Sequence, residues 1–163
     1  GDRILLSGTV FTARDAAHKR LLALVDSCQP LPFPLTDAII YYCGSTPAPE
    51  GRPIGSCGPT TSERMDPFTP RLYQLGLLAT IGKGERSKAV AQTIVRHQGL
   101  YLCAVGGAGA LAAKSVTSAQ VIAFPELGCE AVKQLTIERF PLLVALDSQG
   151  GSIFPNNETF VNF

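Results

Sequence analysis

Short apolar runs alternate along this chain with stretches in which apolar residues recur every three or four positions. The short runs predict buried strands at residues 4–11, 38–43, 54–57, 77–81, 100–105, 121–124, 135–137 and 142–146. Strands that alternate with helical stretches in this way are typical of an α/β domain.

The amphipathic stretches predict four helices, most of them beside a start or stop signal. The first follows residues 12–15, which match a capping box, and ends near Ser27. The others lie at residues 69–76, at residues 87–97, and between a glycine-rich turn at residues 106–109 and residue 115. No repeat or long linker interrupts the series, so residues 1–163 are predicted to form one domain.

The overall composition excludes several classes of partner. Fourteen Lys and Arg against thirteen Asp and Glu give a net charge of +1, without a basic stripe or an acidic tail. Nucleic acid and anionic membranes are therefore not expected as partners. The longest uncharged stretch, residues 99–113, is too short and too rich in glycine to span a bilayer.

The five cysteines do not form a metal-binding or disulfide pattern. Cys28, Cys43, Cys57, Cys103 and Cys129 are odd in number and include no C-x-x-C pair. Their spacing argues against a zinc ribbon or a ferredoxin-like cluster loop, and it favours buried free thiols in a reducing compartment. We therefore expect the chain to work in the cytoplasm.

A first candidate site lies where the strand at residues 4–11 meets the next helix. Such strand-to-helix junctions are common ligand sites in α/β folds, and a helix N-terminus attracts anions. Arg14 in the first turn opposes the helix dipole, which makes sense if it binds an anion there. The alternative is a surface arginine paired with Asp15 or Asp2. His18 lies one turn beyond Arg14, where a structural and a catalytic role both remain open.

A second candidate site is the run from Gly58 to Asp66. Three hydroxyl residues in a row, Thr60 to Ser62, exceed what a helix cap needs. Thr60 and Arg64 are four residues apart, so they would share a face of a helical turn and together suit a carboxylate or phosphate. The alternative is a capped turn with an exposed Arg64.

Two glycine-rich turns are weaker candidates. Glycines on both sides of Lys83 would let a ligand approach the ammonium group, although an exposed turn explains this pattern equally well. The turn at residues 106–111 resembles a dinucleotide loop only loosely, and close packing of a helix on a strand explains it better. Arg14, Arg64 and Lys83 together outline a receptor for a small polyanion, which is one half of an active site.

Two long motifs resemble the β part of class I fumarases and of related tartrate dehydratases. They are GTVFTARDAAHKRL at residues 8–21 and GPTTSERMD at residues 58–66. Shorter runs follow the family's order, namely IYYCG at 40–44, GKG at 82–84, GGAGAL at 106–111, ELG at 126–128 and FP at 140–141. The resemblance covers nearly the whole chain.

This resemblance implies a fold, a cofactor and a partner. The fold would be a swivelling β/β/α domain with a mainly parallel central sheet, a second antiparallel sheet and outer helices. A separate α part would hold a [4Fe–4S] cluster on three cysteines, and none of this chain's cysteines falls on a cluster ligand, so we expect no metal ligand here. The complete enzyme would be a dimer of such α–β units.

The resemblance also implies a reaction and the residues for it. Fumarate and (S)-malate would be interconverted, with Arg14, Thr60, Thr61, Arg64 and Lys83 binding the dicarboxylate and Thr60 removing the C3 proton. A threonine hydroxyl is a poor base, so nearby cations would have to favour its alkoxide.

Two alternatives to the fumarase interpretation remain. One is the β subunit of L(+)-tartrate dehydratase, although Ala13 and Ala17 stand where tartrate enzymes tend to carry cysteines. The other is a non-catalytic swivelling domain that only binds a partner, against which the intact cations and Thr60 argue.

Overall fold

A computed structural model describes residues 1–104 and 109–155 of the chain. Its strands are β1 (Arg3–Thr12), β2 (Ile39–Tyr41), β3 (Ala79–Gly82), β4 (Leu100–Cys103), β5 (Val116–Ala123) and β6 (Val132–Leu146). Its α-helices are α1 (Asp15–Asp26), α2 (Thr69–Gln74), α3 (Lys88–Arg96) and α4 (Gly109–Lys114), and 3-10 helices form η1 (Ser62–Met65) and η2 (Pro125–Glu130). The α/β class predicted from the hydrophobic pattern is confirmed.

The first four strands form the parallel half of a six-stranded sheet with the order β1-β2-β3-β4-β6-β5. Neighbouring residues of these strands point into two different cores. Phe11 contributes to one core and Val10 to the other, and Ile40 and Tyr41 divide in the same way. Because both faces of the sheet are covered, these strands read as continuous apolar runs.

The antiparallel part continues the same sheet. Strand β6 pairs with β1 along one edge, and with β4 and β5 along the other. Among residues 1–104 and 109–155, the predicted second sheet is not observed as a separate sheet: β6, with 15 residues, is long enough to join the antiparallel strands to the parallel ones. Because β6 also pairs with β1, the pairings from β1 through β2, β3, β4 and β6 close on themselves.

Strand β6 also unites two predicted strands, residues 135–137 and 142–146. The polar residues between them suggested a break. In the structure β6 continues through these residues, and its pairing with β1 changes register between Leu6 and Gly8. Arg139 there has a φ of +50°, and its backbone N–H donates to Ser7 Oγ over 2.9 Å. A local kink therefore replaces the turn that the sequence indicated.

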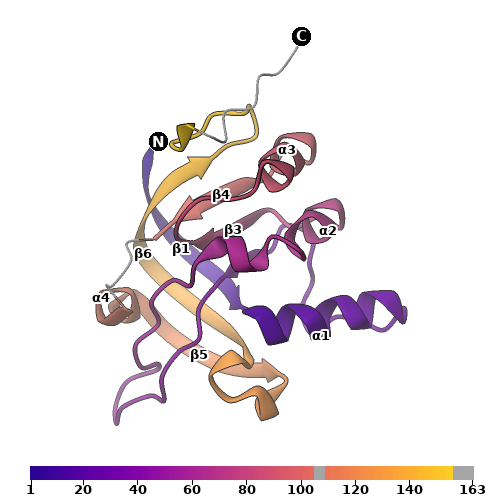
Figure 1. Ribbon diagram of the computed structural model, residues 1–163. Helices are drawn as coiled ribbons and strands as arrows, with labels where there is room; N and C mark the ends of the chain where they lie inside the picture. Colours follow the sequence, from indigo (N-terminus) through magenta and orange to yellow (C-terminus); the bar gives the residue numbers. More distant parts are fainter. Residues whose placement is uncertain (105–108, 156–163) are drawn as a thin grey trace.

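The helices lie on two sides of the sheet. Figure 1 shows α1, α2 and α3 together on one side and α4 apart from them. The first three cover a core that includes Leu21, Leu72 and Ile94, whereas Ala112 of α4 contributes to the other core. Within residues 1–104 and 109–155, no helix is long and apolar enough to cross a membrane.

The prediction of a strand at residues 54–57 is wrong. This segment is an irregular loop, and its residues are apolar because Ile54 and Cys57 are buried in the core beneath it. The loop is tightly folded, since a Cβ atom on Gly55 would lie 2.2 Å from Thr46 Oγ1. Local burial, which a single sequence does not distinguish from pairing, produced the strand-like pattern.

The glycine-rich turn at residues 106–111 lies partly outside the described residues. Its described part begins with Gly109, the first residue of α4. A Cβ atom there would lie 2.9 Å from the backbone nitrogen of Gly58. Close backbone packing, which we preferred for this turn, is therefore observed at Gly109, against a loop and not against a strand.

Candidate functional site

The candidate residues follow the carboxyl ends of neighbouring parallel strands. Arg14 follows β1, Tyr42 follows β2 and Lys83 follows β3. Because β1, β2 and β3 are parallel neighbours, their carboxyl ends meet at one edge of the sheet, where ligands commonly bind in α/β folds. The structure therefore gathers residues that are far apart in the sequence.

Thr60 and Thr61 lie between the segments that follow β2 and β3. The backbone N–H of Thr60 donates to Tyr42 O over 2.7 Å, and the N–H of Lys83 donates to Thr60 O over 3.3 Å. Thr61 is bridged to Lys83 in parallel orientation. The predicted helical turn through Thr60 is therefore wrong, because its backbone N–H and C=O already pair with Tyr42 and Lys83 and the 3-10 helix η1 begins only at Ser62.

The side chains of Thr60 and Lys83 are available to a ligand. Both residues are half-buried. Within the described part of the chain, the Thr60 hydroxyl forms no hydrogen bond and the Lys83 ammonium group forms no ion pair. The backbone segments that carry this hydroxyl and this cation are paired with each other.

The predicted capping box at residues 12–15 is wrong. Helix α1 is preceded by Arg14 in an extended conformation, and the Arg14 side chain does not cap it; the carboxylate of Glu130 instead accepts a hydrogen bond from the N–H of Ala16 over 3.4 Å. Thr12 is still part of β1, where its hydroxyl donates to Ala131 O over 3.3 Å and accepts from the N–H of Lys133. The first turn carries Asp15, as the helix dipole favours, so Arg14 stands just before the helix and not inside it.

Arg14 and Arg64 converge on Asp15. Arg64 contacts both Asp15 oxygens, with Nη2 at 3.1 Å and Nε at 3.3 Å. Arg14 Nη2 lies 3.9 Å from Asp15 Oδ2, and its Nε lies 3.9 Å from Glu130. The buried Arg14 Nε has no hydrogen-bond partner among the described residues. The alternative of an arginine beside Asp15 is therefore observed, with Glu130 as a second nearby carboxylate, and anion binding by Arg14 stays a prediction.

His18 is fully buried and supports the backbone at Arg14. Its Nδ1 donates to Arg14 O over 2.7 Å, and its ring packs against Tyr42 and Phe68. Burial is the main reason why the pKa of His18 falls to about 4, so the ring is neutral at physiological pH. These contacts favour the structural role over the catalytic one.

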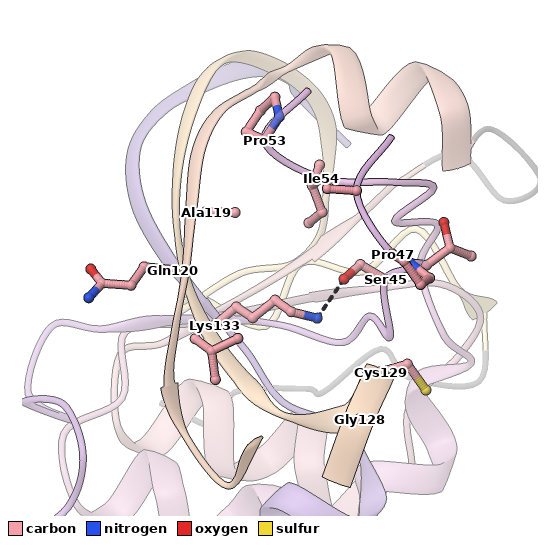
Figure 2. A pocket seen from close by; sticks show the side chains of 12 residues that line it. Ser45, Pro47, Pro53, Ile54, Ala119, Gln120, Gly128, Cys129 and Lys133 are labelled. Atoms are coloured by element: carbon pink, nitrogen blue, oxygen red, sulfur yellow. Dashed lines mark hydrogen bonds between the residues drawn. The ribbon is translucent and has the colours of Figure 1, made fainter. Parts of the chain in front are cut away.

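A cavity of about 360 Å³ adjoins this site on the side of the loop that follows β2 (Figure 2). Lys133 and Ser45 lie within it, and their side chains are joined by a hydrogen bond of 2.7 Å. No pattern in the sequence indicates this cavity, because its walls come from loop, strand and 3-10 helix segments that are distant in the chain.

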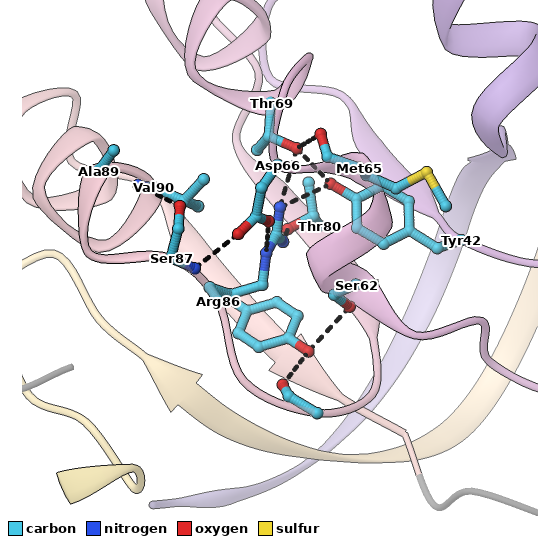
Figure 3. Close-up of polar contacts among 12 residues, drawn as sticks. Tyr42, Ser62, Met65, Asp66, Thr69, Thr80, Arg86, Ser87, Ala89 and Val90 are labelled. Carbon is cyan, nitrogen blue, oxygen red and sulfur yellow. Dashed lines mark hydrogen bonds and ion pairs between the residues drawn. The ribbon is translucent and has the colours of Figure 1, made fainter. Parts of the chain in front are cut away.

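Arg86, a buried arginine, organises the loop after Lys83 (Figure 3). No motif in the sequence indicated a role for it. Arg86 is only 3% exposed, and its Nε donates to Asp66 over 2.7 Å. Its other nitrogens donate to hydroxyl groups of Thr80 (3.1 Å), Thr69 (2.8 Å) and Tyr42 (3.3 Å). Burial by itself would lower the pKa of Arg86. The electrostatic effects of Tyr42, Asp66 and the neighbouring tyrosines together outweigh burial, so the pKa of Arg86 is raised.

Tyr101 extends the network of Arg86 toward the candidate site. Its ring lies 4.9 Å from the Arg86 guanidinium carbon. Its hydroxyl is within hydrogen-bond distance of Gly84 O (2.8 Å) and Ser62 Oγ (2.9 Å). The network therefore joins the turn that carries Lys83 to the segment that carries Thr60 and Arg64. Figure 3 shows the side chains of this network around Arg86.

The cysteines are poorly placed to hold an iron–sulfur cluster together. Cys43 and Cys57 are buried, whereas Cys28 and Cys129 are exposed. Burial raises the pKa of both buried thiols, that of Cys57 to about 11, although the charge of Lys133 acts in the opposite direction. Across the described ranges, no three His, Cys, Asp or Glu side chains gather as metal ligands. The donor groups of this chain do not fit a cluster that needs three thiolates.

Comparison with known proteins places this arrangement in one class. The family model for the fumarase C-terminus matches residues 1–157. The chain is 41% identical over 157 residues to "Fumarate hydratase 2" of Leishmania major, covering 94% of this chain and 28% of that protein. It is 39% identical over 154 residues to "Fumarate hydratase class I, anaerobic" of Escherichia coli (strain K12), covering 93% and 28%.

A third relative is much shorter. The chain is 39% identical over 160 residues to "Putative L(+)-tartrate dehydratase subunit beta" of Methanocaldococcus jannaschii, which covers 94% of this chain and 82% of that protein. The names of all three relatives are those of hydro-lyases. This chain belongs to the fumarase C-terminus family, and it spans about 28% of the length of the fumarate hydratases it matches.

Proposed function

We propose that this chain is the substrate-binding part of a [4Fe–4S]-dependent hydro-lyase that interconverts fumarate and (S)-malate. The observation that carries the proposal is the collection of Arg14, Thr60, Thr61, Arg64 and Lys83 at one edge of the sheet. The two matched fumarate hydratases are about three and a half times as long as this chain, which leaves room in such proteins for a cluster-bearing part.

The cations of this site have the chemistry to hold a dicarboxylate. Arg14 and Arg64 already orient toward the carboxylate of Asp15, and a guanidinium group binds a carboxylate with two parallel hydrogen bonds. Lys83 adds a single point charge on a neighbouring segment. Together they would stabilise the negative charge that builds up on the substrate when a proton leaves the carbon beside its carboxylate.

Thr60 is the proposed proton-transfer residue. Its hydroxyl is free of hydrogen bonds within the described residues, and its backbone is fixed between Tyr42 and Lys83. For this role, the cations of the site and the cluster would have to favour the alkoxide form, which a threonine in water would not adopt. The alkoxide would take the C3 proton of malate, and the hydroxyl would return it when fumarate is hydrated.

The cluster, the partner and the assembly are parts of the same proposal. A separate α part would hold the cluster, because the thiols of this chain do not gather as ligands in the described ranges. When bound, the cluster would supply a Lewis acid for the substrate. We place the complete enzyme in the cytoplasm, as a dimer of α–β units.

A tartrate dehydratase is the second candidate, and one observation favours it. The tartrate dehydratase β relative is covered over 82% of its length, so it resembles this chain in size as well as in sequence. Fumarate remains the preferred substrate because Ala13 and Ala17 are both buried beside the Arg14–Asp15 pair, where tartrate enzymes tend to carry cysteines.

The chain alone is expected to show no hydratase activity. After anaerobic iron–sulfur reconstitution, it should also lack the absorbance of a cluster, since its cysteines are dispersed. Mixing with the cognate cluster-bearing part should produce a larger complex in sizing chromatography and restore fumarate hydration. A stable, near-stoichiometric cluster on the isolated chain would overturn the proposed division of labour, and tartrate turnover without fumarate turnover would favour the second candidate.

In the reconstituted complex, Arg64→Lys is expected to lower kcat/KM for fumarate by about 10-fold or more. Lysine keeps the charge but loses the planar fork that binds a carboxylate with two hydrogen bonds. Arg71→Lys is the matched control, because Arg71 forms a 2.5 Å surface ion pair with Asp26 away from the site. Steady-state kinetics of both variants test the assignment, and equal values for the two would remove Arg64 from the binding group.

A further inference from the structure

The cavity beside the candidate site has an arrangement of its own. It has a volume of about 360 Å³, within the range of small-molecule pockets. The loop after β2, strand β5, helix η2 and Lys133 of β6 line it. Arg14, Thr60, Arg64 and Lys83 are not among its lining residues.

Lys133 places a positive charge in this cavity without a matching negative charge. Its ammonium nitrogen lies 2.7 Å from Ser45 Oγ, and Ser45 is only 4% exposed. In the part of the chain that the structure describes, no carboxylate lies within ion-pair distance of Lys133. A half-buried cation with one neutral partner is costly, and an anion in the cavity would offset that cost.

The loop that forms one wall is held in place by its own contacts. The backbone N–H of Thr46 donates to Ser56 O over 3.0 Å, and Thr46 Oγ1 accepts from the N–H of Ser56 over 2.8 Å. Pro47 and Pro53, both in the cavity wall, restrict the loop further. A wall that is fixed before binding lowers the cost of ordering a ligand.

The rest of the wall is largely apolar. Pro47, Pro53 and Ile54 line one side, and Ala119 and Val121 of β5 line the other, as Figure 2 shows for the residues that it labels. A ligand that fits must therefore combine one negative group for Lys133 with an apolar body. A dicarboxylate would place its second charge against these apolar residues, which disfavours it.

We propose that this cavity is a second ligand site, which binds a small monocarboxylate with a short branched or linear apolar chain. The carboxylate would accept hydrogen bonds from Lys133 Nζ and Ser45 Oγ. The site is independent of the proposed reaction, although Gly44 links the two regions: a Cβ atom there would lie 3.0 Å from Arg14 Nη1 and 3.4 Å from Cys129 O.

Titration of the ¹⁵N-labelled chain with 3-methylbutanoate tests the proposal. We expect saturable chemical-shift changes at Ser45, Gln120 and Cys129, with a dissociation constant in the millimolar range. The uncharged analogue 3-methylbutanamide should produce no saturable change, because it cannot neutralise Lys133. This comparison uses the unmodified chain and does not depend on the folding of any variant.

Variants then test whether Lys133 supplies the positive charge that binds the carboxylate. Lys133→Met should weaken 3-methylbutanoate binding at least about 10-fold, because one charge-assisted hydrogen bond is lost. Lys88→Met is the control: it removes an exposed lysine from α3 and should leave the binding unchanged. Fumarate should shift resonances near Thr60 and Lys83 instead. Equal binding of the acid and the amide, no saturable shifts with the acid, or an unchanged affinity in Lys133→Met would each overturn the proposal.

Discussion

The Thr60→Ala variant of the complete enzyme is expected to bind fumarate and to turn it over at least about 100-fold more slowly. The substitution removes one hydroxyl and leaves Arg14, Arg64 and Lys83 in place, so the carboxylates should still be held. The backbone of Thr60 is fixed by hydrogen bonds to Tyr42 and Lys83, which alanine can also form. The loss should therefore appear in kcat and not in substrate affinity.

Exchange of the malate C3 proton with solvent gives a second measurement. It should fall together with kcat in Thr60→Ala, because both report on the same proton transfer. Thr60→Ser keeps a hydroxyl group and should retain much of the activity. Thr93→Ala, which removes a threonine of α3 that bonds only within its own helix, serves as the matched control. If Thr60→Ala keeps the original kcat and C3 exchange, Thr60 only positions the substrate and another group removes the proton.

Arg86→Met is expected to lower the free energy of unfolding by about 3–5 kcal/mol, the usual cost of removing one partner of a buried ion pair. The substitution leaves the carboxylate of Asp66 without its cation in a site where its side chain is only 10% exposed. It also removes the hydrogen bonds that the hydroxyl groups of Thr69, Thr80 and Tyr42 accept from Arg86. Chemical denaturation of the isolated chain measures this loss.

Two further variants separate the buried charge from general effects of substitution. Arg71→Met breaks an exposed pair with Asp26 and should cost no more than about 1 kcal/mol. In the double variant Arg86→Met/Asp66→Asn, the isolated carboxylate is gone, so the loss should be smaller than the sum of the two single losses. A loss below about 1 kcal/mol for Arg86→Met alone would show that this network does not stabilise the fold.

The sequence was most informative where local chemistry determines the structure. Residues that follow the strands at 4–11 and 77–81 were predicted to lie at ligand-binding junctions, and the strands found there, β1 and β3, both pair with β2 in parallel. The helix at residues 87–97 was also recognisable, because Ser87 caps it by accepting a hydrogen bond from Val90 N. Both signals reside in a few consecutive residues.

The sequence was least informative where the structure depends on contacts between segments that are distant in the chain. Nothing near Arg86 indicates that Asp66 and Tyr42 lie around it. Nothing near Thr12 indicates that its hydroxyl bonds to residues 131 and 133, so that it does not cap helix α1. The same holds for Lys133 and Ser45, 88 residues apart, which meet only because the loop after β2 folds over β6.

The pairing of β1 with β6 has a consequence for the time course of folding. Arg3 pairs with Leu143 and Phe11 with Gln134, so β1 can pair with β6 only after all the residues between the two strands have been synthesised. Contacts of such high sequence separation have a high entropic cost of loop closure and slow the folding of a domain. On the ribosome, the β1–β4 half with Arg14, Thr60 and Lys83 is synthesised first, and both of its edges, at β1 and at β4, stay unpaired until β6 is made. An edge of this kind can pair with another chain, so the nascent protein is most exposed to misassembly in the interval before β6 emerges.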